Sequence, residues 1–260
     1  MSLLAVPLSL LVLLVATPLL VRTLDRNAGW PLAAAFLGLA GYVLGTGAGD
    51  IVDGHPATFS AVWLPDVLPG GGDISFALSM DATGIFFTLL ALLIGAAVFS
   101  YSTRYLHRTS EGEQVMSFYV LMSGFMASVV LLFLADDVTV LFVGWELVSL
   151  ASFFLIARAG HTGEHGAVRT LLLTFTGGLA LLVALGIAVT ATGTTSLSGI
   201  IASDVWGTDD VRTAIVAVLI AVAGFSKAAQ FPFHAWLPEA MAAATPVSAF
   251  LHAAAVVKAG

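Results

Sequence analysis

Residues 138–157 read VTVLFVGWELVSLASFFLIA, an apolar stretch with a single charged residue, Glu146. A membrane-spanning helix needs about 20 predominantly apolar residues, which this stretch provides. The whole chain has the same character, since 59% of its 260 residues are hydrophobic and 10% are charged. Soluble domains carry about 25% charged residues. We therefore predict an all-α polytopic membrane protein, in which each spanning helix satisfies its own backbone hydrogen bonds.

Further apolar stretches predict the other spanning helices. Together with Val138–Ala157, the expected spans are Leu3–Val21, Pro31–Thr46, Ala82–Ser102, Val115–Leu134, Val168–Thr190 and Val211–Phe231. An eighth helix is expected to begin with Thr245 as N-cap and Pro246 at its first position. It extends about 22 Å to Gly260, less than the roughly 30 Å hydrocarbon core. We therefore expect the chain to be the N-terminal part of a longer protein, truncated in the eighth helix.

Basic residues are distributed unequally between the predicted loops. The first, third and fifth loops contain six arginines: Arg22, Arg26, Arg104, Arg108, Arg158 and Arg169. The alternate loops contain Arg212 and most of the aspartates. Because cytoplasmic loops carry an excess of basic residues, we predict that the arginine loops are cytoplasmic and that the N-terminus lies outside the cell (inner) membrane.

The longest loop, residues 47–80, is predicted to lie on the outer side and to contain a short hairpin or an amphipathic segment. We divide the chain into residues 1–110, which hold helices 1–3 and this loop, and residues 111–260, which hold helices 4–8.

Three ionisable residues lie within the apolar stretches, namely Glu146, Lys227 and Lys258. A charge at the centre of a membrane helix costs about 2.5–3.5 kcal/mol on insertion scales. Such residues are usually functional and often mark a path for ions or protons. We therefore predict that these three side chains take part in ion or proton transport.

The segment Lys227–Pro238 reads KAAQFPFHAWLP and predicts a broken helix. Pro232 lacks a backbone donor and is expected to end the helix just after Lys227. A broken membrane helix is tolerated where it lines a hydrated cavity. Lys227 and Gln230 are then expected on one face, with His234 just past the break. The alternative is a simple proline kink with a lysine that reaches the membrane surface.

Glu146 and Lys227 have opposite charges, so we expect them to interact. At an effective dielectric constant of 20, such a pair is worth about 4 kcal/mol at 4 Å and about 1.7 kcal/mol at 10 Å. A modest change in separation therefore changes how firmly the lysine holds its proton. The alternative is a fixed ion pair that joins two helices. His252 and Lys258, about 9 Å apart along their helix, are expected to border the same hydrated channel, although a helix histidine is often only a packing residue.

No metal or cofactor site is predicted. The chain has no cysteine, which excludes disulfides and thiolate metal sites. Residues 161–165 match the zinc pattern H-x-x-E-H, but the surrounding glycines predict a loop, whereas that motif needs a helix. Asp136 and Asp137 are expected to cap a helix, with cation entry as the alternative.

Several long motifs resemble one membrane-protein family. FPFHAWLPEAM (Phe231–Met241) and TPVSAFLHAAAVVKAG (Thr245–Gly260) resemble the antiporter-like subunits shared by respiratory complex I and Mrp cation/proton antiporters. WELVSLASFFLI (Trp145–Ile156), GTTSLS (Gly193–Ser198) and FSYSTRY (Phe99–Tyr105) most resemble the large A subunit of Mrp antiporters. Ala244 departs from the family pattern, in which a proline is expected.

This resemblance implies an antiporter-like helical bundle of two inverted five-helix repeats, each with a broken helix, of which this chain holds only part of the first. It implies a proton relay through Glu146, Lys227, His252 and Lys258, with His234 in the hydrated region near the break. The expected function is that of a subunit in a multisubunit Na⁺ or K⁺/proton antiporter, a secondary transporter rather than an enzyme. Its expected partners are the other subunits of the complex and the lipid bilayer. One alternative is a proton-pumping subunit of complex I or a related membrane-bound hydrogenase, and another is a non-conducting membrane scaffold.

Overall fold

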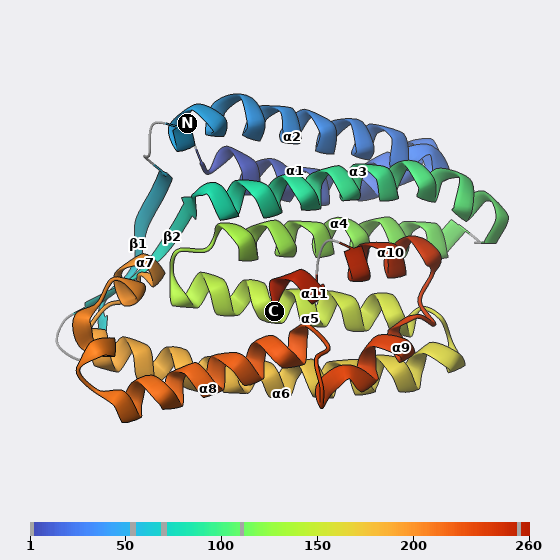
Figure 1. Cartoon of the computed structure of the whole chain (residues 1–260). Coiled ribbons are helices and arrows are strands. Elements are labelled where there is room, and N and C mark those ends of the chain that lie inside the picture. Colours follow the sequence, from blue (N-terminus) through green and yellow to red (C-terminus); the bar gives the residue numbers. More distant parts are fainter. Residues whose placement is uncertain (1–2, 53–55, 69–71, 110–111, 254–255) are drawn as a thin grey trace.

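The computed structural model is a bundle of long helices lying side by side, with a β-hairpin at one end (Figure 1). It describes residues 3–52, 56–68, 72–109, 112–253 and 256–260. The long helices are α1 (Ala5–Leu24), α2 (Gly29–Val52), α3 (Ala82–Thr109), α4 (Gly112–Leu134), α5 (Val138–Ala157), α6 (His161–Thr192) and α8 (Asp210–Lys227). The shorter elements are η1 (Asp25–Ala28), β1 (Ala57–Leu68), β2 (Gly72–Met80), α7 (Leu197–Ile201), η2 (Asp204–Gly207), η3 (Phe233–Ala235), α9 (Trp236–Ala240), α10 (Thr245–Ala253) and α11 (Val256–Ala259).

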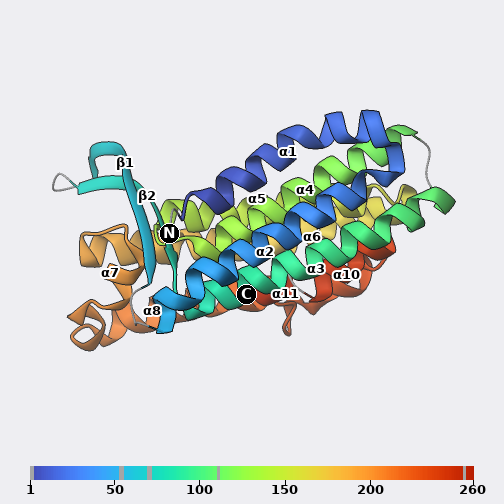
Figure 2. The same cartoon turned by 90° about the horizontal axis from the view of Figure 1, so that it is seen from above.

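The length and composition of the helices confirm a multi-pass membrane protein. Five stretches within the described ranges are long and apolar enough to cross a membrane: Ala5–Gly47, Ala82–Leu106, Gln114–Leu134, Val138–Ala157 and Gly163–Thr192. The first of them includes both α1 and α2, which lie alongside each other after the turn at η1 (Figures 1 and 2). Helix α8 is not among the five, and it ends at Lys227 rather than at the predicted Phe231.

The predicted hairpin is present in the segment between α2 and α3. Strands β1 and β2 pair antiparallel, with Ala57 opposite Met80 and Phe59 opposite Leu78. The amide of Asp136 donates to the carbonyl of Ala77 at 3.0 Å, which attaches β2 to the connection between α4 and α5. The hairpin therefore helps to fix the start of α5.

The connection between α4 and α5 also provides the N-cap of α5. Asp137 caps the helix, because its carboxylate accepts from the amide of Thr139 at 2.8 Å. The carboxylate of Asp136 accepts from the amide and the hydroxyl of Ser198, at 2.9 and 3.1 Å, and so binds α7. These contacts confirm the predicted capping role for Asp137, while Asp136 serves instead as a link to α7.

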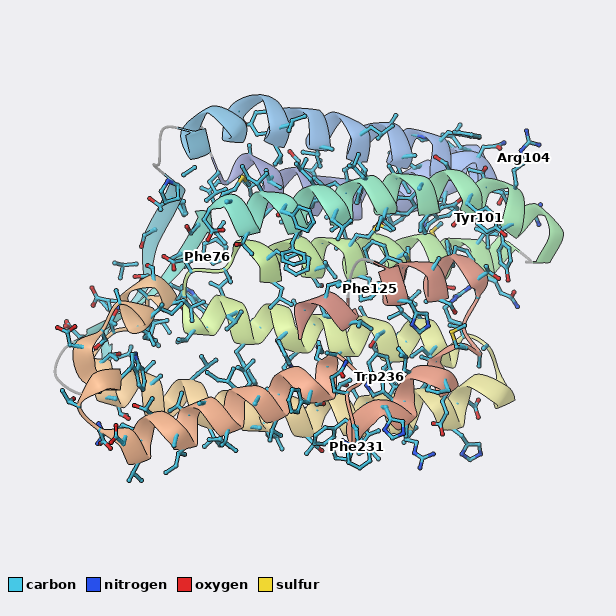
Figure 3. The ribbon with its side chains drawn as sticks, in the orientation of Figure 1. Phe76, Tyr101, Arg104, Phe125, Phe231 and Trp236 are labelled. Carbon is cyan, nitrogen blue, oxygen red and sulfur yellow. The ribbon has the colours of Figure 1, made fainter. Side chains whose placement is uncertain are left out.

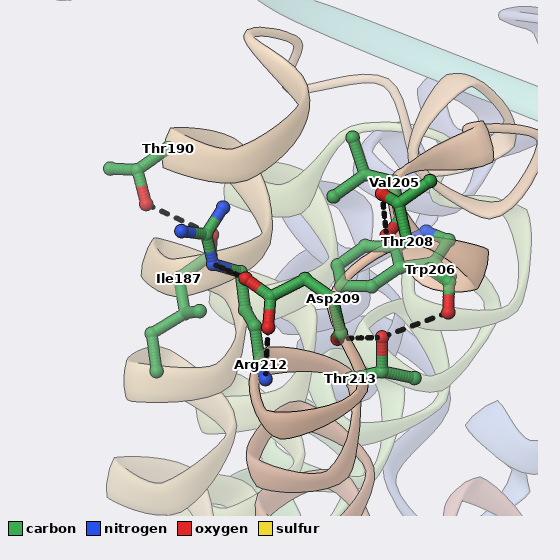
Figure 4. A network of polar contacts seen from close by, with 8 residues as sticks. All are labelled: Ile187, Thr190, Val205, Trp206, Thr208, Asp209, Arg212 and Thr213. Atoms are coloured by element: carbon green, nitrogen blue, oxygen red, sulfur yellow. Dashed lines mark hydrogen bonds and ion pairs between the residues drawn. The ribbon is translucent and has the colours of Figure 1, made fainter.

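A second polar network fixes the start of α8 (Figure 4). Asp209 caps this helix by accepting from the amide of Arg212 at 3.0 Å, and the Arg212 guanidinium lies 3.4 Å from the same carboxylate. Thr213 donates to the carbonyls of Trp206 and Asp209 at 3.0 and 2.8 Å. Because α8 rises about 1.5 Å per residue, its last residue, Lys227, lies about 26 Å from this end. The C-terminal end of α8 lies near the middle of the bundle (Figure 1).

The two ends of the bundle differ in charge. Arg26 in η1, Arg104 near the end of α3 and Arg158 after α5 lie at the end opposite the hairpin, where Figure 3 labels Arg104. The hairpin, α7 and the aspartate-rich start of α8 lie at the other end (Figure 1). The alternation of basic and acidic loops along the chain thus becomes a separation in space.

Helix α6 corrects one prediction. It begins at His161, so residues 161–165 are helical and not in a loop. A side chain at Gly163 would collide with the carbonyl of Ile156, and one at Gly166 would lie 3.0 Å from the carbonyl of Glu239. These glycines allow neighbouring backbone segments to approach α6 closely, and they lie within the helix rather than in a loop. Among the described residues, no group of three or more metal-ligating side chains lies close enough together to hold a metal ion.

Candidate functional site

Lys227 is completely buried, with 0% of its surface exposed, at the end of α8, and its side chain reaches α5. Its Nζ donates to the backbone carbonyl of Trp145 at 2.8 Å and to Ser149 Oγ at 2.6 Å. The same nitrogen lies 4.7 Å from the centre of the Trp145 ring, a cation–π distance. One turn of α5 therefore surrounds the lysine ammonium with two hydrogen-bond acceptors and an aromatic face.

Glu146, the neighbour of Trp145 in sequence, points to a different place. Its carboxylate lies against Gly178 of α6, where an added Cβ would collide with Oε1 and lie 3.1 Å from Cδ. Oε1 is buried and has no hydrogen-bond partner among the described residues. Within that part of the chain no salt bridge of 4.0 Å or less joins Glu146 to Lys227. The fixed ion pair, which was the alternative to a separable pair, is therefore not formed in this structure.

The carboxylate also borders an apolar groove. Side chains of α5 and α6, among them Phe142, Phe175 and Leu179, line this groove of about 680 Å³ together with Glu146. A carboxylate without a partner beside apolar surface is costly, so its presence points to a functional constraint rather than to stability.

Two adjacent glycines of α6 bring the site together. An added Cβ at Gly177 would lie 2.5 Å from the side chain of Ser226, the residue before Lys227. Ser226 Oγ donates to the carbonyl of Leu173 in α6 at 2.6 Å. Gly177 thus admits α8, while Gly178 admits Glu146. Our sequence reasoning missed both, although adjacent glycines inside a long apolar helix are a recognisable signal of close approach.

The helix break after Lys227, which was predicted from Pro232, is present in the structure. Helix α8 ends at Lys227, and α9 begins again at Trp236. The indole of Trp236 is buried and donates to the carbonyl of Ser226 at 2.9 Å, which satisfies a helix-end group at the break. Phe231 lies at the break with 81% of its surface exposed (Figure 3).

Gln230 does not share a face with Lys227, contrary to prediction. The helix has already ended, Ala229 adopts a positive φ of 51°, and Gln230 is exposed.

The remaining predicted relay residues lie around this centre, less closely joined to it. His252 in α10 is half-buried, and its Nε2 has no hydrogen-bond partner among the described residues. Lys258 belongs to α11, which packs against α4, α5 and α8, but its side chain is exposed. His234 is exposed and stacks on Phe231, with ring centres 5.8 Å apart. Helix α10 begins at Thr245 itself, and Ala244 accepts the first helical bonds, so the predicted N-cap was one residue too late.

The motifs and the fold match known transport proteins. Residues 135–260 match the family described as NADH:quinone oxidoreductase/Mrp antiporter, TM. A chain of the Mrp complex from Dietzia sp. DQ12-45-1b superposes on all of this chain with a TM-score of 0.90 and 48% sequence identity. Residues 135–260 belong to the NADH:quinone oxidoreductase/Mrp antiporter membrane family. The antiporter-like bundle with a broken helix is therefore confirmed.

Curated relatives agree with the structural match. The protein assigned as antiporter subunit mnhA2 in Staphylococcus haemolyticus is 33% identical over 96% of this chain, and that of Staphylococcus saprophyticus is 42% identical over 81% of it. The chain spans 30% and 26% of these relatives' lengths and 27% of the Dietzia chain. The similarity therefore concerns about a quarter to a third of each relative.

Proposed function

We propose that this chain contributes a proton path to a subunit of a multisubunit monovalent cation/proton antiporter, with Na⁺ or K⁺ as the cation. The observation that carries the proposal is the completely buried Lys227 at a helix break, against the turn of α5 that bears Glu146. Burying an ammonium inside the protein is costly. A lysine with only a structural role therefore has no reason to occupy this position, and buried charges of this kind usually mark a functional site.

The side chains suit proton transfer. The Lys227 ammonium has two neutral acceptors, and its flexible four-carbon stem allows it to change partners. Approach to Glu146 stabilises the protonated lysine, and separation favours release of the proton. In this proposal the proton passes from Lys227 by way of His252 to Lys258, and His234 forms a branch near the break.

The charge distribution supports an orientation in the cell membrane. With the arginine end in the cytoplasm, the hairpin, α7 and the N-terminus lie outside. Residues 1–260 contain no cysteine, so single-cysteine variants of the full protein, with any cysteine outside these residues replaced by serine, test this orientation. Thr208→Cys is expected to react with an impermeant maleimide from outside, and Thr23→Cys only after the membrane is opened.

A proton-pumping subunit of complex I has the same chemistry and remains the second candidate. The relatives assigned as antiporter subunits and the Mrp chain at 48% identity favour the antiporter. The domain division at residue 110 stays a prediction, and the family match begins further along the chain, at residue 135.

The proposal is tested in everted membrane vesicles that contain the full subunit within its complex. Glu146→Gln removes the charge but keeps the shape, and it is expected to abolish almost all proton movement driven by added Na⁺ or K⁺. Glu146→Asp, which keeps the charge, is the matched control. Unchanged exchange in Glu146→Gln, with normal subunit content, would refute the role of this carboxylate.

A further inference from the structure

Lys227 bonds to Trp145 and Ser149 on the turn of α5 that also carries Glu146. We propose that Ser149, together with the Trp145 carbonyl, forms a holding site that keeps the lysine ammonium away from Glu146 between proton transfers. Ser149 is thus a positioning residue for Lys227. This inference rests on the proposed function, because it assigns a step within the same proton path.

The geometry of the holding site is complete without Glu146. Ser149 is fully buried, and its hydroxyl donates to the Trp145 carbonyl at 3.1 Å while accepting from Lys227 Nζ at 2.6 Å. The Trp145 carbonyl accepts from the same Nζ at 2.8 Å. Both acceptors are neutral, so together they hold the ammonium less firmly than a carboxylate at the same distance would. The lysine can therefore leave.

The carboxylate of Glu146 lies against α6, on a different row of α5 from Ser149. Three residues along an α-helix correspond to a rotation of about 60° between side chains, so Glu146 and Ser149 lie on neighbouring rows of α5. Gly178 leaves room for the carboxylate against α6. Lys227 reaches α5 from α8 and bonds to Ser149 and to the Trp145 carbonyl. In this proposal a change of the lysine side-chain rotamer transfers the ammonium between Ser149 and Glu146.

The holding site determines how often the pair forms. A hydrogen bond from a charged donor, when removed, changes an equilibrium by about tenfold or more. Removing the Ser149 hydroxyl therefore shifts the lysine toward Glu146 by about that factor. A lysine that remains paired with the carboxylate does not release its proton, and exchange falls.

The experiment compares variants of Ser149 in the assembled complex, with subunit content measured by blotting. Ser149→Ala removes the acceptor, and Ser149→Thr retains a hydroxyl that can bond to the carbonyl four residues earlier. The matched control is Ser102→Ala, because Ser102 is also fully buried and, among the described residues, its hydroxyl bonds only to the carbonyl of Val98 in its own helix, at 2.7 Å. Cation-driven proton movement in vesicles is the readout, with Lys227→Ala as the reference for complete loss.

We expect exchange to fall at least about threefold in Ser149→Ala, to return in Ser149→Thr and to stay unchanged in Ser102→Ala. A cryo-electron microscopy map of Ser149→Ala is expected to show Lys227 Nζ within ion-pair distance of Glu146. Wild-type exchange in Ser149→Ala, or equal loss in Ser149→Ala and Ser149→Thr, overturns the holding site. If Ser149→Ala lowers subunit content, Ser149→Cys replaces it, since a thiol fills a similar volume but accepts hydrogen bonds weakly. Full exchange in Lys227→Ala refutes the proposed function, whereas loss there with full exchange in Ser149→Ala refutes the holding site alone.

Discussion

Gly178→Ala places a methyl group where the structure has the carboxylate of Glu146. The added Cβ collides with Oε1 and lies 3.1 Å from Cδ, whereas ordinary contact begins at 3.4 Å. Helix α6 itself is not weakened, because alanine is favoured over glycine in a helix interior by about 1 kcal/mol. The strain therefore falls on Glu146, whose Oε1 has to move by about 1.5 Å to reach an ordinary contact distance.

A movement of this size changes the interaction with Lys227 measurably. At an effective dielectric constant of 20, a change in charge separation of about 1.5 Å, for example between about 6 and about 4.5 Å, is worth about 0.9 kcal/mol, which is about fivefold in an equilibrium constant. We therefore expect Gly178→Ala to change cation-driven proton exchange by about two- to fivefold, while subunit content stays normal.

The matched control for this substitution is in the same helix. A Cβ at Gly186 has no atom within 4 Å, so Gly186→Ala changes helix propensity without touching Glu146. Exchange is measured by the quenching of a pH-sensitive dye in everted vesicles after addition of Na⁺ or K⁺. Wild-type exchange in Gly178→Ala, or an equal effect in Gly186→Ala, would refute the reasoning.

Three further outcomes are expected. Gly177→Ala overpacks α6 against Ser226 and should lower the free energy of unfolding by about 1–3 kcal/mol. Thermal unfolding of the detergent-solubilised complex measures this loss, and an unchanged unfolding temperature would contradict it. Trp236→Phe removes the hydrogen bond to the Ser226 carbonyl and should cost about 1 kcal/mol in the same assay, whereas Trp30→Phe, at an exposed indole, should cost less. Lys258→Arg keeps the charge but cannot release a proton near neutral pH, so it should impair exchange as much as Lys258→Ala; substantial activity in the arginine variant would make Lys258 a counter-charge.

The sequence predicted those features that depend on local chemistry. Helix α5 has the predicted bounds, because an apolar run of membrane length is bordered by an aspartate cap and an arginine. The end of α8 follows from Pro232, which cannot continue a helix. The predicted beginning of α6 was wrong, because the glycines near His161, a residue type that usually marks a loop, here lie within the helix at close contacts between backbones.

The candidate site was predicted in its residues but not in its contacts. Glu146 and Lys227 are conspicuous as charges within apolar stretches. Their actual partners depend on how three helices pack, since the Trp145 carbonyl is available to Lys227 only at the observed approach of α8 to α5. Nothing in the order of residues along α6 states that Gly178 faces Glu146. The contribution of Ser149 likewise becomes visible only when α8 is in place.

The most direct test of the central claim substitutes Lys227 in the complete antiporter complex, reconstituted into liposomes. Lys227→Ala removes the group that is proposed to carry the proton, and Lys227→Arg retains a charge that does not deprotonate near neutral pH. The measurement is the initial rate of proton movement driven by a Na⁺ or K⁺ gradient, normalised to the amount of assembled complex. We predict that both variants lose almost all exchange. Exchange near the wild-type rate in Lys227→Arg would show that only the charge is needed, and exchange near that rate in Lys227→Ala would remove Lys227 from the proton path.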